Sequence, residues 1–92
     1  MARIFNIYFL YDDVLHNAIV SERNTGSFTE YILGNLDAEL RLQLPGLSII
    51  SPSPGHLFFP GSSTDFSIPL MEAIIQSIVR HLHAGNDVSS KA

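Results

Sequence analysis

Residues 3–22 read RIFNIYFLYDDVLHNAIVSE, two apolar runs on either side of the pair Asp12-Asp13. Isoleucine, phenylalanine and tyrosine favour β-strands, and adjacent aspartates favour a tight turn. The stretch therefore predicts a β-hairpin with a two-residue loop. In this register Arg3 lies opposite Glu22, and their opposite charges support the pairing. The alternative interpretation makes the second run, 14–21, a short helix.

The predicted register gives the hairpin two different faces. One face is apolar enough for a protein core, and His16 is its clearly polar member. The other face mixes asparagine and serine with apolar side chains, which makes it too apolar for a fully solvated surface and too polar for a core. The apolar side chains of this mixed face are Ile4, Tyr8, Leu10, Leu15 and Ile19.

The spacing of Ser27 and Glu30 is typical of a capping box at the start of a helix. We predict a helix from Phe28 to about Leu44, ended by Pro45-Gly46. Its main buried stripe repeats every four residues and consists of Phe28, Ile32, Leu36, Leu40 and Leu44, together with Leu33. A second row on this helix is either ordinary exposed apolar surface or a partner-binding row, and it consists of Tyr31, Ala38 and Leu42.

Two short apolar runs, 47–50 and 56–59, are bounded by proline and glycine and predict two more strands. Whether these strands pair with each other stays open. A last helix is expected to begin after Asp65 or Ser67 as N-cap and to end at Gly85. Its apolar arc is about 180° wide, more than packing on one flat sheet usually requires.

The predicted order of elements is strand, strand, helix, strand, strand, helix. The simplest way to bury their apolar stripes is an α+β fold, a two-layer ββαββα sandwich. It has a four-stranded mixed or antiparallel sheet with both helices on one face. We expect a single domain over residues 1–85 and a disordered polar tail over 86–92.

The composition narrows the classes of partner. Of the 92 residues, 46% are apolar and 15% are charged, which favours a folded domain over a disordered chain. The five basic residues are scattered singly, so binding to nucleic acid is not expected. No segment approaches the ~20 apolar residues that span a bilayer, so we expect a cytoplasmic protein without membrane contact. The absence of cysteine excludes disulfides and thiolate ligands.

Few side chains could support chemistry. His16 is expected on the core face, His56 begins a predicted strand, and a hydroxyl-rich loop follows at 61–67. His81 and His83 stand two residues apart, so they lack the i, i+4 spacing of a zinc pair and suit a helix C-terminus instead. The sequence contains no nucleophile elbow, metalloprotease motif or dinucleotide fingerprint. We therefore predict no catalytic residue, no metal ligand and no cofactor.

These features favour an interaction module without catalysis that forms a homodimer or binds another protein. The side chains expected at its interface are Tyr8, Leu10, Leu15, Ile19, Tyr31, Ala38 and Leu42. The alternative is a small-molecule-binding protein or an enzyme with a pocket near His56 and the loop from Gly61 to Ser67, in which His16 or His56 acts as general base. The candidate ligand-binding residues of this alternative are His16, His56, Ser62, Ser63 and Thr64.

Overall fold

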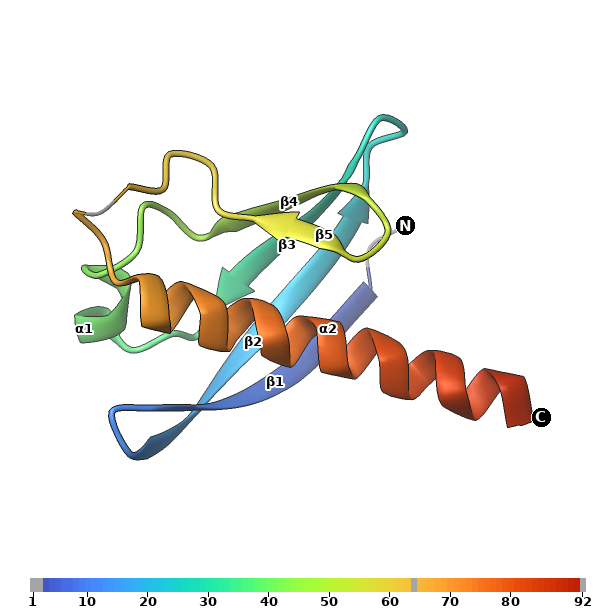
Figure 1. Ribbon diagram of the computed structural model, residues 1–92, viewed down its shortest axis with the longest axis horizontal. Helices are drawn as coiled ribbons and strands as arrows, with labels where there is room; N and C mark the ends of the chain where they lie inside the picture. Colours follow the sequence, from blue (N-terminus) through green and yellow to red (C-terminus); the bar gives the residue numbers. More distant parts are fainter. Residues whose placement is uncertain (1–2, 64, 92) are drawn as a thin grey trace.

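Five strands form one antiparallel sheet in the computed structural model of the chain, which describes residues 3–63 and 65–91 and, from 84 onward, the backbone alone. The elements are β1 (Arg3–Tyr11), β2 (Val14–Asn24), β3 (Thr29–Gly34), α1 (Ala38–Arg41), β4 (Ser48–Ser53), β5 (His56–Phe58) and α2 (Ile68–Lys91). The strands lie in chain order, so each pairs with its neighbour in sequence. The sheet curls, and α2 crosses its concave side (Figure 1).

The hairpin prediction is confirmed, including its register. β1 and β2 pair antiparallel with Arg3 opposite Glu22. Both loop residues have left-handed backbone angles, with φ of 56° at Asp12 and 63° at Asp13. Two consecutive positive φ values are typical of a type I′ turn, whose twist matches that of the flanking strands. The helical alternative for 14–21 is wrong.

The predicted ββαββα sandwich, with a four-stranded sheet and two helices on one face, is wrong. The segment predicted as a helix from Phe28 to Leu44 forms strand β3 and the four-residue helix α1 instead. The sheet therefore has five strands. Among the described residues, α2 is the one long helix.

The alternation of side chains in β3 explains this difference. Tyr31 and Leu33 are buried, with 4% and 2% exposure, whereas Ile32 between them remains 37% exposed. A period of two belongs to a strand with one covered face. Glu30 lies in this strand and does not cap a helix. Its carboxylate lies 2.9 Å from the guanidinium of Arg23 on β2 instead. Pairing between β2 and β3 along the whole strand outweighs the local helix signal.

A short helical turn survives from the predicted helix. The chain leaves β3 through Asn35, whose φ of 57° is left-handed. Asp37 caps α1, and its carboxylate accepts a hydrogen bond from the backbone N–H of Glu39 at 3.1 Å. Part of the predicted stripe is buried even so, namely Leu33 in β3 and Leu36, Leu40 and Leu44 after it.

The two short strands predicted at 47–50 and 56–59 are present as β4 and β5, and they pair with each other. The pairing is irregular between Ile50 and Ser53. Pro52 lies in this irregular stretch. Proline has no backbone N–H, and here no regular hydrogen bond between the strands is lost. β4 also pairs with β3, which extends the hairpin of β1 and β2 into a continuous sheet.

Helix α2 fills the concave side of the curled sheet (Figure 1). Ser67, one of the two predicted N-caps, accepts a hydrogen bond from the backbone N–H of Leu70 at 3.3 Å. Leu70, Ile74 and Ile78 have no exposed surface. A curled sheet contacts a helix around more of its circumference than a flat sheet does. The curl therefore accounts for the wide apolar arc of this helix.

The backbone of α2 continues past Gly85, where the sequence predicted its end, to Lys91. Its last turns extend beyond the sheet (Figure 1). The predicted disordered tail, 86–92, falls where side chains lie outside the described residues.

Candidate functional site

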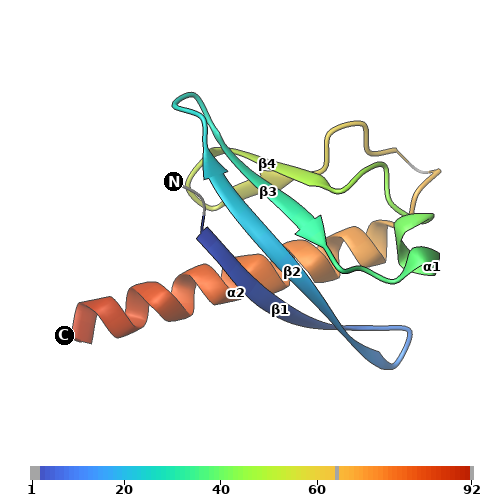
Figure 2. The same cartoon turned by 180° about the vertical axis from the view of Figure 1, so that it is seen from behind.

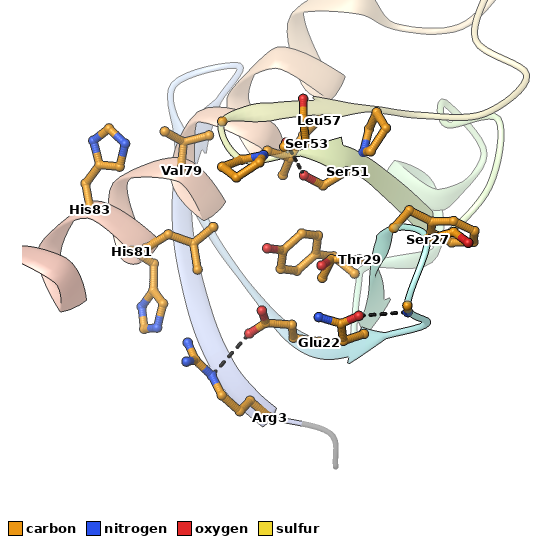
Figure 3. A pocket seen from close by; sticks show the side chains of 18 residues that line it. Arg3, Glu22, Ser27, Thr29, Ser51, Ser53, Leu57, Val79, His81 and His83 are labelled. Carbon is orange, nitrogen blue, oxygen red and sulfur yellow. Dashed lines mark hydrogen bonds and ion pairs between the residues drawn. The ribbon is translucent and has the colours of Figure 1, made fainter.

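A cleft of about 880 Å³ opens at the end of the sheet where β1 begins. Three parts of the chain surround it. Side chains on the inner face of β1 to β4, at this end of the sheet, form its floor. The β2–β3 and β4–β5 turns form one rim, and side chains of α2 form the opposite wall. Figure 3 shows the labelled side chains arranged around this common opening.

Two cross-strand rows of mainly polar side chains form the floor of the cleft. Each row follows from the antiparallel register, because residues directly opposite each other share a face of the sheet. The first row consists of Arg3, Glu22 and Tyr31, and the second consists of Asn24, Thr29 and Ser51. Beyond them toward the core, the inner face becomes apolar with Phe5, Val20 and Leu33.

Arg3 and Glu22 form an ion pair in the cleft (Figure 3). The Nε atom of Arg3 lies 3.1 Å from Oε1 of Glu22, and the Arg3 side chain is 66% exposed. Oε1 is shielded from solvent, yet it accepts no hydrogen bond from the described residues. The Arg3 guanidinium is therefore close enough to compensate the negative charge of Glu22, but its N–H is not aligned to donate a hydrogen bond to Oε1. A buried acceptor without a donor is rare in proteins.

Tyr31 lies directly opposite Glu22 on the neighbouring strand and is buried. Burial raises the pKa of the Tyr31 hydroxyl above its ordinary value of 10.0, and the nearby Glu22 carboxylate raises it further. The Arg3 guanidinium opposes these effects. Near neutral pH the phenol therefore keeps its proton.

Two histidines of α2 belong to the wall of the cleft. The ring of His81 stacks on Phe5 of β1, with centroids 4.0 Å apart and planes inclined by 5°. Stacking fixes the plane of this imidazole, although the residue is exposed. His83 is also exposed. Because α2 continues to Lys91, neither histidine lies in the last turn of the helix, contrary to the sequence prediction.

The β2–β3 turn at the rim is held by local hydrogen bonds. The side-chain carbonyl of Asn24 accepts from the backbone N–H of Gly26 at 2.8 Å. The backbone N–H of Thr25 donates to the carbonyl oxygen of Phe28 at 2.9 Å. Gly26 has a φ of 95°, which only glycine adopts readily. This rim of the cleft is therefore preformed.

A second notable surface is the outer face of the β1–β2 hairpin, defined by Ile4, Asn6, Tyr8, Leu10, Leu15, Asn17, Ile19 and Ser21. Neither of the described helices lies over it (Figure 2). Its most exposed apolar side chains are Ile4 at 71%, Tyr8 at 62%, Leu10 at 67% and Leu15 at 65%. Ile19 is half-buried. The eight residues of the outer face include no charged side chain.

The structure separates the members of the predicted helical row. Tyr31 lies in the core and contributes to the floor of the cleft. Ala38 begins α1, and Leu42 follows it with 83% exposure. Since the helix that was predicted to align these three residues is absent, they do not form a row.

The residues of the predicted pocket near His56 are likewise dispersed. His16 is half-buried and stacks against Phe9 at 5.5 Å, and His56 is exposed beside Phe58. Ser62 and Ser63 line a separate groove of about 320 Å³. The walls of this groove come from β5 and α2 and are largely apolar, and neither histidine lines it. Thr64 lies outside the described residues.

Sequence reasoning missed most of the residues that line the cleft. Glu22 was identified only as the partner of Arg3, and Tyr31 was assigned to the surface of a helix. The signal that could have found them is the alternation from Thr29 to Leu33, which is typical of a strand. As a strand, this segment brings Tyr31 beside Glu22 on the inner face.

Within the described residues, no group of three or more histidine, aspartate or glutamate side chains could hold a metal ion. None of the described helices is both long and apolar enough to cross a membrane. Comparisons of the chain with protein-family models, with curated proteins and with solved structures find no match. The cleft and the outer face are therefore the two candidate functional surfaces among the described residues.

Proposed function

We propose that this protein is a self-associating domain that forms a homodimer through the outer face of the β1–β2 hairpin. The observation that supports the proposal is the exposure of Ile4, Tyr8, Leu10 and Leu15, each above 60%, on one uncovered face. Soluble monomers rarely leave contiguous apolar surface of this kind open. Burying it stabilises an assembly by about 25 cal/mol for each Å² removed from water.

A second copy of the chain suits this face because the face is uncharged. In a two-fold symmetric interface the same patch meets itself, so a charge in the patch would meet a like charge. The outer face has none, and the ion pair Arg23–Glu30 lies just beyond it, where charges remain solvated. Tyr8 and the side chains of Asn6 and Asn17 supply polar groups at its centre. Two such sheets can pack face to face as in a β-sandwich.

Sedimentation velocity across micromolar concentrations tests the proposal. We expect a concentration-dependent dimer for the wild type. Tyr8→Lys and Leu15→Lys should shift the protein to a folded monomer, because both side chains are exposed in the single chain and do not contribute to its core. Leu42→Lys is the matched control, since Leu42 is even more exposed but lies outside the outer face.

Two results contradict the proposal. One is a wild type that stays monomeric throughout the concentration range. The other is a dimer that survives both substitutions on the outer face. A dimer that dissociates only with Leu42→Lys would assign the interface to a different surface.

A further inference from the structure

We propose that the cleft at the open end of the sheet binds a small, neutral, hydroxyl-rich molecule of the size of a monosaccharide, with a ligand hydroxyl donating to the carboxylate of Glu22. This binding site is separate from the outer face, because the cleft lies on the concave side of the sheet. Its volume of about 880 Å³ is ample for one sugar ring.

The Glu22 carboxylate is ion-paired with Arg3, but its capacity to accept hydrogen bonds is not filled. Oε1 of Glu22 is shielded from solvent and accepts no hydrogen bond from the described residues. An acceptor of this kind is stabilised by any donor that reaches it, and hydrogen bonds to a charged group are stronger than those between neutral groups. The Glu22 side chain is 22% exposed, so a ligand hydroxyl that enters the cleft can reach the carboxylate and supply such a donor.

The charges in the cleft favour a neutral ligand. The Arg3 guanidinium lies 3.1 Å from the Glu22 carboxylate and compensates its charge. An ammonium group would therefore meet Arg3 as a like charge, and a phosphate or carboxylate would meet Glu22. The other titratable side chains that line the cleft are Tyr31, which is neutral near pH 7, and the imidazoles of His81 and His83. A neutral ligand avoids both repulsions.

The floor and walls of the cleft combine hydroxyl groups with apolar surface. Thr29 and Ser51 present hydroxyls, and the Ser51 hydroxyl donates to the carbonyl oxygen of Ser53 at 2.9 Å, which leaves its oxygen free to accept. Phe28 and Leu57 add apolar surface nearby. Sugars carry hydroxyls that both donate and accept, together with C–H faces that pack on apolar side chains. Their chemistry therefore matches both kinds of surface.

A ¹H–¹⁵N NMR titration with D-glucose, D-galactose and D-mannose, each to about 50 mM, tests the site at the millimolar affinity expected for a single sugar. The expected result is saturable shifts for at least one sugar, centred on the amides of Glu22, Thr29 and Ser51. Glucosamine and glucose 6-phosphate serve as cationic and anionic probes of the same ring. Both should bind more weakly than the neutral sugar.

Glu22→Gln should weaken binding about tenfold, since a neutral amide oxygen is a poorer acceptor than a carboxylate. Glu30→Gln is the matched control, because Glu30 also pairs with an arginine across two strands but lies on the opposite side of the sheet. It should leave the affinity unchanged. Thr29→Val provides a second variant on the floor, and thermal unfolding confirms that each variant is folded.

Three outcomes overturn the proposal. The first is the absence of saturable shifts with all three neutral sugars. The second is binding that responds equally to Glu22→Gln and Glu30→Gln. The third is binding of glucosamine or glucose 6-phosphate in the cleft without binding of a neutral sugar, which would assign the site to an ionic ligand.

Discussion

The hydroxyl of Ser77, on α2, lies 3.0 Å from the backbone carbonyl oxygen of Tyr8, on β1. β1 is an edge strand with β2 as its neighbour in the described sheet, so alternate peptide groups of β1 face away from the sheet. Exposed groups of this kind can pair with a strand of another molecule. Ser77 occupies one of them, and its hydroxyl also lies 2.9 Å from the carbonyl oxygen of Ala73 in its own helix. The helix thus partly protects the edge of the sheet. This is one reason to place the proposed dimer interface on the outer face and not along β1.

Replacing Ser77 with alanine should destabilise the protein by roughly 1 kcal/mol, because the part-buried Tyr8 carbonyl loses its donor. The same substitution should increase aggregation on storage, since the edge of β1 becomes more available. Urea unfolding and light scattering measure the two effects. Gln76→Ala is the control, because Gln76 is exposed on the same helix. Equal stability of the two variants would show that the contact contributes nothing.

Leu33→Ala and Ile32→Ala distinguish the observed strand from the helix that the sequence predicted. Leu33 is 2% exposed and its truncation should cost about 2–5 kcal/mol, as for other buried leucines. Ile32 points to the outer side with 37% exposure, so its truncation should cost much less. In the predicted helix both side chains belonged to the buried stripe. Similar losses of unfolding free energy for the two variants would therefore count against strand β3.

The pKa of Tyr31, raised by burial and by Glu22, links stability to alkaline pH. Because the folded-state pKa is higher than the unfolded one, this contribution is complete below about pH 10 and is lost as the pH rises through the folded-state pKa. We expect the unfolding free energy to fall more steeply above pH 10 in the wild type than in Tyr31→Phe. Denaturant titrations at a series of pH values measure both slopes. Parallel slopes would contradict the assignment.

The turn between β1 and β2 offers a stabilising substitution. Asp12 and Asp13 both have positive φ, which costs a non-glycine residue conformational energy, and Asn-Gly is the preferred pair in a type I′ turn. The double variant Asp12→Asn, Asp13→Gly should raise the unfolding free energy by about 0.5–1 kcal/mol. Asp65→Gly serves as control, because Asp65 is an exposed loop residue outside this turn. A melting temperature that falls in the turn variant would argue against the I′ geometry.

The first hairpin could be predicted because several local signals agree on it. The apolar alternation, the aspartate turn and the charges of Arg3 and Glu22 all specify one register. The N-cap of α2 at Ser67 follows from similarly local chemistry. Contacts between residues close in sequence carry this information, so no knowledge of the rest of the fold is needed.

The segment after Ser27 could not be resolved in the same way, because its local signals conflict with its tertiary pairing. The Ser27–Glu30 spacing and the leucines at intervals of four favour a helix, whereas the free edge of β2 favours a strand. The Glu30 carboxylate forms an ion pair with Arg23 of β2 and does not cap a helix N-terminus. This error also concealed the cleft, since Tyr31 and Thr29 reach its floor only when their segment is a strand.

The chain-order arrangement of the five strands has a consequence for how the protein acquires its structure. Each strand can pair with the one synthesised just before it, so the strand contacts are local in sequence, and the connection from β3 to β4, which contains α1, is the longest loop to close. Helix α2 follows all five strands in the chain, and until it docks, the apolar inner residues such as Val20 and Leu33 remain open to water. We therefore expect a stage of synthesis in which paired strands are not yet covered by α2. Aggregation and chaperone binding are expected to be greatest during that stage.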